Sequence, residues 1–363
     1  VPTYSQLRCN SRAFVLDGNL ESRAITNSDG LHMQSPCFLD VTGDVTFVGT
    51  SGSTNTNGRF SQGHLRVGGD FTETTQSGAS AGFESTGTIV SFSPGTHLVE
   101  QANPTVNNSR FEDIVVPAGA TVTLTTPVWV NGRATLDGAV DGEALRVADH
   151  LPTTAGTVDV VVEVVGDVSM DAGRNLVVPE LLITDAGRLD LNRHSLFVDG
   201  DFTHIEGAGD GLRMVNTEDL LTVTGATVFS SVSSYSTSDE LTNGEMRLFG
   251  SVEQTGGANA LIINGTHVVF MAGPARNLTV ASGASTFDNV TVQDGAEVTL
   301  VSDTRFDDFD LAGTFTITAG ISLLVDDLTL RSTGTLHNNG TLTYGGGFND
   351  EGGVVNGTPP QSE

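Results

Sequence analysis

The sequence predicts an all-β fold in which short repeated strand-turn units stack as the coils of a parallel β-solenoid. Three observations favour it: a long unit that occurs twice, a short strand-turn motif that recurs inside both copies, and apolar residues that alternate with polar ones within the strands. The composition agrees, since 44 of the 363 residues are glycine, which suits tight turns. Hydrophobic residues make up 37% of the chain, enough for a continuous core.

A unit of about 180 residues is duplicated. The segment FEDIVVPAGATVTL begins at Phe111 and returns at Phe287 as FDNVTVQDGAEVTL, with seven of fourteen positions identical and an offset of 287 minus 111, or 176. The motif DGLHM at Asp29 returns as DGLRM at Asp210, an offset of 181. The predicted organisation is an N-terminal segment that acts as a cap or an inter-subunit strand (1–28), repeat copy 1 with extra coils near 139–187 (29–209), repeat copy 2 (210–345) and a C-terminal tail (346–363).

A shorter motif joins two strands through Gly-Asp or a related pair. It occurs as VTGDVT at Val41, VGGDFT at Val67 and VDGDFT at Val198. Glycine supplies backbone angles closed to other residues, and we expect the aspartate to accept hydrogen bonds from amides of its own turn. Val122 and Leu124 exemplify the two-residue period of a half-buried strand.

Stacked coils give each strand a parallel neighbour on both sides, which satisfies its backbone amides. The alternative that the short motifs leave open is a string of tandem β-sandwich domains with Gly-rich hairpins. One stretch, Glu143 to His150, has the composition of one or two helical turns.

The order of motifs resembles a repeat of very large secreted bacterial surface proteins that are rich in Gly, Thr and Asp. The resemblance rests on DGLHM, VTGDVTF, GHLRVGGDFT and FEDIVVPAGATVTL, and it covers most of residues 29 to 345 in two copies. It implies parallel β-helix-type repeats and a location outside the cell or on its surface. The resemblance brings no catalytic residues with it.

Acidic residues outnumber basic ones by 44 to 16, every basic residue is arginine, and the net charge is −28. Because phosphate binding depends on clustered Lys and Arg, we expect no nucleic-acid partner. No apolar run is long enough for a membrane span. We expect a secreted protein in which Cys9 and Cys37 form a disulfide, with two buried free thiols as the alternative.

We expect no catalytic residues and no cofactor. The absence of lysine excludes phosphate loops of the GxxxxGK type, and HExxH, paired CxxC and GxSxG are also missing. A polysaccharide-degrading enzyme would need two nearby carboxylates. Neighbouring aspartates that could serve such an enzyme could also bind calcium. The candidates are Asp307, Asp308, Asp310, Asp326 and Asp327.

The leading functional hypothesis is a structural subunit that associates with copies of itself, end to end, into an extracellular filament, sheath or surface layer. End coils of a solenoid leave strand edges and core unpaired unless a cap covers them, and neither terminus has an obvious cap. A monomeric adhesin or glycan-binding domain is the alternative, although one Trp and three Tyr offer few rings for sugars. The assembly residues that we expect are Val1, Tyr4, Leu7, Phe14, Leu342, Tyr344 and Phe348.

Overall fold

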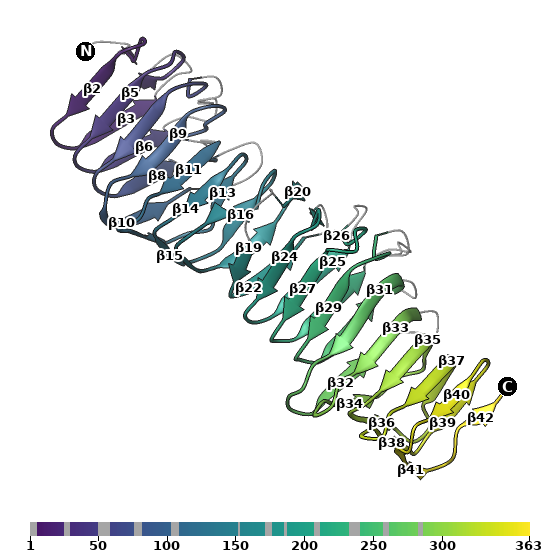
Figure 1. Ribbon diagram of the computed structural model, residues 1–363. Helices are drawn as coiled ribbons and strands as arrows, with labels where there is room; N and C mark the ends of the chain where they lie inside the picture. The colour runs from purple at the N-terminus through teal and green to yellow at the C-terminus, as the bar shows by residue number, and fades with distance from the viewer. Residues whose placement is uncertain are drawn as a thin grey trace. The chain divides into compact units, whose positions relative to one another are not determined.

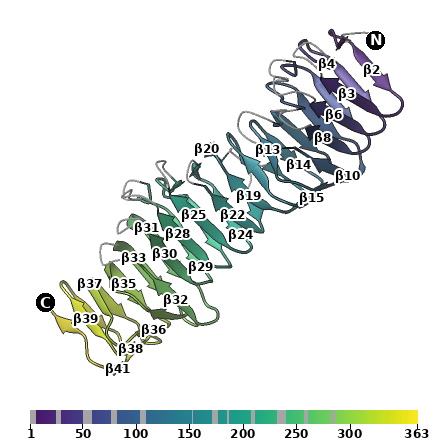
Figure 2. The same cartoon turned by 180° about the vertical axis from the view of Figure 1, so that it is seen from behind.

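The chain is a parallel β-solenoid of about 13 turns (Figures 1 and 2). The computed structural model describes residues 6–24, 30–49, 59–75, 82–102, 109–151, 153–170, 176–184, 187–206, 211–231, 240–256, 261–281 and 286–363. Within these ranges every regular element is a strand and none is a helix. The chain divides into two compact units, Val1–Asp171 and Ala172–Glu363.

In unit 1 the strands of each coil lie on three faces. One seven-stranded sheet contains, in chain order, β2 (Ala13–Leu16), β5 (Phe38–Val41), β7 (His64–Val67), β9 (Ile89–Phe92), β11 (Asp113–Val116), β14 (Ala134–Leu136) and β17 (Thr153–Thr154). The other contains β3 (Leu20–Ala24), β6 (Val45–Gly49), β8 (Phe71–Thr75), β10 (Gly95–Glu100), β12 (Ala120–Leu124), β15 (Ala139–Gly142) and β18 (Thr157–Asp159). On the third face lie β1 (Gln6–Arg8), β4 (Gly30–His32), β13 (Val128–Val130), β16 (Leu145–Val147) and β19 (Val161–Val164), and β20 (Asp167–Ser169) ends the unit.

Unit 2 repeats this construction. One sheet contains β21 (Leu176–Val178), β24 (Ser195–Val198), β27 (Leu220–Val223), β29 (Glu245–Leu248), β31 (Ile262–Phe270), β33 (Thr286–Val292), β35 (Thr304–Leu311), β37 (Ser322–Leu330), β39 (Thr341–Tyr344), β40 (Phe348–Asp350) and β42 (Gln361–Ser362). A second contains β22 (Glu180–Ile183), β25 (Phe202–Glu206), β28 (Thr227–Ser231), β30 (Val252–Gly256), β32 (Arg276–Thr279), β34 (Glu297–Leu300), β36 (Thr314–Ile317), β38 (Thr335–Asn338) and β41 (Val354–Gly357). The pair β23 (Arg188–Asp190) and β26 (Gly211–Arg213) completes the unit.

The core of each unit consists of the inward-pointing residues of successive coils. In unit 1, Phe47 packs on Phe60 and Phe83 with ring centroids 5.3 and 4.9 Å apart. In unit 2, Phe309 packs on Phe315 at 4.9 Å. The alternation predicted from the sequence is observed, for example in β12, where every second side chain is buried. Stacking the same face of each coil therefore produces one continuous apolar column within each unit.

The Gly-Asp motifs form the corners between two faces, but the aspartates act between coils and not within their own turn. Asp44 Oδ1 accepts a hydrogen bond from the Asp70 amide at 3.0 Å, and Asp70 Oδ1 accepts one from the Leu98 amide at 2.8 Å. Our expectation that each carboxylate bonds amides of its own turn is wrong here. The next coil lies close enough to provide the donor, since a Cβ added to Gly68 would stand 2.3 Å from the Thr42 carbonyl oxygen.

Three sequence expectations differ from the structure. The stretch Glu143 to His150 holds strand β16 and no helical turn, because Leu145 and Val147 pair with β13 and β19 in the ladder. The segment 346–363, expected as a tail, contains β40, β41 and β42, which continue the coils. The β-sandwich alternative is wrong for the described residues, because sandwiches use antiparallel sheets and every pairing between the named strands is parallel.

Candidate functional site

The candidate site is the first coil of unit 1. Its strands β1, β2 and β3 pair in parallel with β4, β5 and β6 of the next coil. The described part of the N-terminal segment therefore builds the first coil of unit 1. Among the described residues no strand pairs with the opposite edges of β1, β2 and β3, so three ladders end there.

The inward row of this first coil is covered on one side only. Phe14 lies in register with the buried Leu39, and Leu7 with the buried Leu31. Phe14 is nevertheless 42% exposed and Leu7 54% exposed, and Val15 on the outward row is 72% exposed. Three large apolar side chains thus gather at one end of the unit, and internal coils bury the positions that correspond to Leu7 and Phe14.

A small apolar hollow of about 160 Å³ opens between these side chains. Six of the residues that line it are Leu7, Phe14, Leu16, Leu20, Leu31 and Leu39. Among the described residues, the arrangement provides apolar surface beside the outer edges of β2 and β3.

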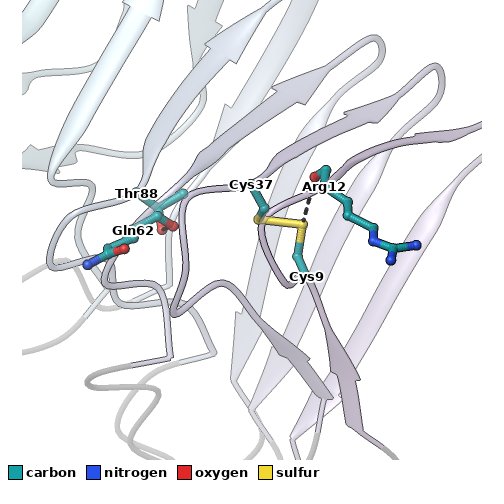
Figure 3. Close-up of a disulfide and its surroundings, with 5 residues drawn as sticks. All are labelled: Cys9, Arg12, Cys37, Gln62 and Thr88. Atoms are coloured by element: carbon teal, nitrogen blue, oxygen red, sulfur yellow. Dashed lines mark hydrogen bonds between the residues drawn. A yellow bond between two sulfur atoms is a disulfide. The ribbon is translucent and has the colours of Figure 1, made fainter.

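The predicted disulfide is present and joins the first coil to the second (Figure 3). The Cα atoms of Cys9 and Cys37 are 5.8 Å apart, in the usual range for a disulfide, and both residues are buried. Figure 3 shows the Arg12 side chain directed away from the sulfur atoms, and Arg12 is exposed. The disulfide therefore anchors the N-terminal coil to the second coil from the buried side.

The C-terminal coil was expected to contribute the other assembly residues. Tyr344 and Phe348 are half-buried and their ring centroids lie 5.7 Å apart. Leu342 is 1% exposed, because it points into the core opposite Leu323, so we leave it out of the interface. Val1 and Tyr4 lie outside the described residues.

The five calcium candidates lie on β35 and β37, and three of them form ion pairs with arginines. Arg305 contacts Asp307 at 3.2 Å and Asp326 at 2.9 Å, and Arg331 contacts Asp310 at 2.7 Å. Asp327 Oδ1 accepts a hydrogen bond from the Gly347 amide at 2.5 Å, and Asp308 lies opposite Asp327 in register. In the part of the chain that the structure describes, no group of three or more His, Cys, Asp or Glu is arranged to hold a metal ion.

A polar hollow of about 190 Å³ lies beside these acids, on strands β31, β33, β35 and β37. His267, Asn289, Asp308 and Asp327 occupy neighbouring strands along it. Nearby, burial and the adjacent Asp307 carboxylate raise the pKa of Asp288. The strand spacing of about 4.8 Å brings Asp308 and Asp327 close together. Because polar side chains line this hollow, it is the candidate for a carbohydrate site among the described residues.

Two buried titratable side chains were missed in the sequence. Glu73 Oε1 accepts hydrogen bonds from the Gly82 and Phe83 amides at 2.6 and 2.8 Å, and burial raises the pKa of Glu73 to about 7. His204 packs against Phe229, and burial lowers the pKa of His204 to about 4. Glu73 and His204 each end the same motif, GDFTE and GDFTH. Because each lies two residues after a buried phenylalanine, the two-residue period of the strand could have predicted that both side chains point inward.

Comparisons of the chain with protein-family models, with curated proteins and with solved structures found no match. No helix long and apolar enough to cross a membrane occurs among the described residues. The interpretation of the site therefore depends on its own geometry.

Proposed function

We propose that this chain is a non-enzymatic structural subunit that assembles end to end into an extracellular filament, sheath or surface layer. The observation that carries the proposal is the first coil of unit 1, where no described strand pairs with the outer edges of β2 and β3 and where Leu7, Phe14 and Val15 are exposed. The occupant that we propose for this surface is a second copy of the chain.

A solenoid coil that exposes strand edges and apolar side chains is costly in water. A strand edge with unpaired amides, next to exposed apolar residues, favours pairing with another strand. Soluble proteins normally blunt such edges with charges, bulges or a covering segment. Here the edge strand β2 has the sequence AFVL, which carries no charge and has high strand propensity. Binding a further coil would satisfy the amides and bury the apolar row together.

The extracellular part of the proposal has two supports. Disulfides persist in oxidising compartments, and Cys9 and Cys37 are bonded. The repeat motifs also resemble those of large secreted bacterial surface proteins. A net charge of −28 suits a protein that stays away from nucleic acid.

The proposal is tested by the oligomeric state of the purified chain and of two matched variants. Sedimentation velocity and negative-stain microscopy of the intact chain should reveal concentration-dependent linear assemblies. Val15→Asp places a charge on the open edge and should abolish assembly. Leu98→Asp should not, since Leu98 is an exposed apolar residue (45%) that lies on β10, away from the first coil. A chain that stays monomeric at high concentration would refute the proposal.

A second candidate function, glycan binding by a surface adhesin, is favoured by the polar hollow on β31, β33, β35 and β37. Its side chains, including His267, Asn289 and Asp308, can hydrogen-bond sugar hydroxyls. Asp308 and Asp327 are register partners on adjacent strands, and glycoside hydrolysis uses a pair of carboxylates, so hydrolysis is the third candidate. A glycan array and a polysaccharide-degradation assay, each repeated with Asp308→Asn, test both; no binding and no degradation by the intact chain would eliminate them.

A further inference from the structure

Acceptor motifs for N-linked glycans are concentrated in unit 2. Five of the seven asparagines after residue 260 have Thr two positions later with no proline between, whereas only one of the other fourteen has such a Ser or Thr. The motif N-x-S/T marks an asparagine that can be glycosylated on the surface of a secreted protein. The five are Asn264, Asn277, Asn289, Asn339 and Asn356. Asn289 is half-buried in the polar hollow and Thr266 of the Asn264 motif is completely buried, so these two motifs are partly covered.

The other three asparagines, Asn277, Asn339 and Asn356, are exposed. Asn277 lies on β32, Asn339 directly follows β38, and Asn356 lies on β41, and these strands belong to one sheet of unit 2 (Figure 1). Among the described residues, no hydrogen bond engages their side-chain amides. All three amide nitrogens are therefore accessible to a reagent from solvent.

Strand alternation places both polar groups of each motif on the same side of the chain. In β32, Asn277 is exposed and Thr279 half-buried on the outward row, with the buried Leu278 between them. In the other two motifs both residues are exposed, and these pairs are Asn339 with Thr341 and Asn356 with Thr358. Each acceptor amide thus stands beside the hydroxyl that completes its motif.

We propose that Asn277, Asn339 and Asn356 carry N-linked glycans. The inference rests on the extracellular part of the proposed function, because such glycans are attached to exported chains. In the reaction, the side-chain amide nitrogen bonds to C1 of the first sugar of a lipid-linked oligosaccharide. The bond between C1 and the oxygen of the lipid phosphate breaks, and the phosphate leaves with the proton that the amide gives up.

The glycans gather along one outward row of the sheet. This row consists, in register, of Asn277, Thr299, Thr316, His337 and Asn356. Its first and last members are four strand spacings apart, about 19 Å, and the third acceptor lies beside the row, directly after β38. Bulky, hydrated glycans so close together cover this face of the sheet and keep it from packing sideways against another protein. Association is then left to the strand edges.

The test is mass spectrometry of the full chain recovered from outside the cells that produce it. Trypsin cuts after arginine and yields 277–305, which holds the first site, and a peptide that begins at Ser332 and holds the other two. Fragmentation that retains the glycan should place a sugar on each of the three asparagines. The intervening peptide, 306–331, contains no asparagine and should have its unmodified mass.

Matched variants test whether the motif directs the modification. Thr341→Ala keeps Asn339 but removes the hydroxyl of its motif, so the chain should lose the mass of one glycan, and Thr341→Ser should restore that mass. Thr279→Ala and Thr279→Ser make the same comparison at Asn277, so the result does not depend on the folding of one variant. Asn349 is exposed but lacks the motif, and it should stay unmodified.

Three results would contradict the glycans. If the chain found outside the cells has unmodified asparagines, the inference is wrong, while end-to-end assembly stands or falls by its own sedimentation test. If the chain is unmodified and found only inside the cells, the extracellular location is wrong as well. Sugar on Asn349, or on serine or threonine in place of the three asparagines, would also overturn the inference, because neither pattern follows the N-x-S/T motif.

Discussion

The substitution Glu73→Gln should remove a large part of the pH dependence of the stability of unit 1. The Glu73 side chain is completely buried beside the core, in register with Phe47. Burial disfavours its charged form and raises its pKa from 4.5 to about 7, even though the Gly82 and Phe83 amides and the Ser109 hydroxyl donate to it. The desolvation of this carboxylate therefore outweighs the hydrogen bonds that favour its charged form.

Glu73 makes the free energy of unfolding fall as the pH rises, because the folded and unfolded chains release its proton at different pH values. The folded protein holds the Glu73 proton up to about pH 7, whereas the unfolded chain releases it near pH 4.5. The stabilisation is thus complete below pH 4.5 and is lost as the pH rises through 7. Since one pKa unit corresponds to about 1.4 kcal/mol, the free energy of unfolding should fall by about 3 kcal/mol across this window because of Glu73.

The assay is urea unfolding, followed by fluorescence of the single tryptophan, Trp129, at pH values from 4.5 to 8. The intact chain should lose stability across this range, and Glu73→Gln should lose about 3 kcal/mol less. Glu100→Gln is the matched control, since Glu100 is an exposed glutamate of the same unit, and it should follow the intact chain. If Glu73→Gln and the intact chain show parallel curves, the burial argument is wrong.

Two other predictions concern links between coils. Replacing both Cys9 and Cys37 by serine should lower the free energy of unfolding by about 3 to 4 kcal/mol, because the bond closes a loop with a sequence separation of 28 residues. The same loss should follow reduction of the intact chain, and equal unfolding midpoints with and without reductant would contradict it. Asp70→Ala should cost about 0.5 to 1.5 kcal/mol, since it removes the acceptor of the Leu98 amide, whereas Asp70→Asn retains an acceptor oxygen and should cost less. Equal losses in urea unfolding would mean that the hydrogen bond between coils contributes nothing.

The repeated motifs were enough to predict the solenoid. A period of two residues determines which side chains point inward, and this local rule holds in β12 as it does in β36. The closeness of Cys9 and Cys37 in the chain was likewise enough to suggest their bond. These features depend on short stretches of sequence, so they can be predicted without the rest of the molecule.

The exposure of an individual side chain depended on whether neighbouring coils cover it on one side or on both. Leu342 and Phe14 both point inward and read alike in sequence, yet the first is 1% exposed and the second 42%. The difference is that Leu342 has coils on both sides and Phe14 on one. The stretch from Glu143 to His150 was misassigned for a related reason, since pairing with neighbouring coils outweighs its modest helix propensity.

The sequence by itself therefore determined the repeat, the alternation and the fold class, and the tertiary structure decided which residues remain available. Asp70 turned out to bond the following coil, and arginines occupy three of the five carboxylates considered for calcium. Apart from Arg305 and Asp307, which are two residues apart, those partners lie about one coil away in sequence, 28 residues in the case of Asp70 and Leu98. Pairing across that distance depends on the length of the intervening loops and the registry of the stacked strands, which no local pattern encodes.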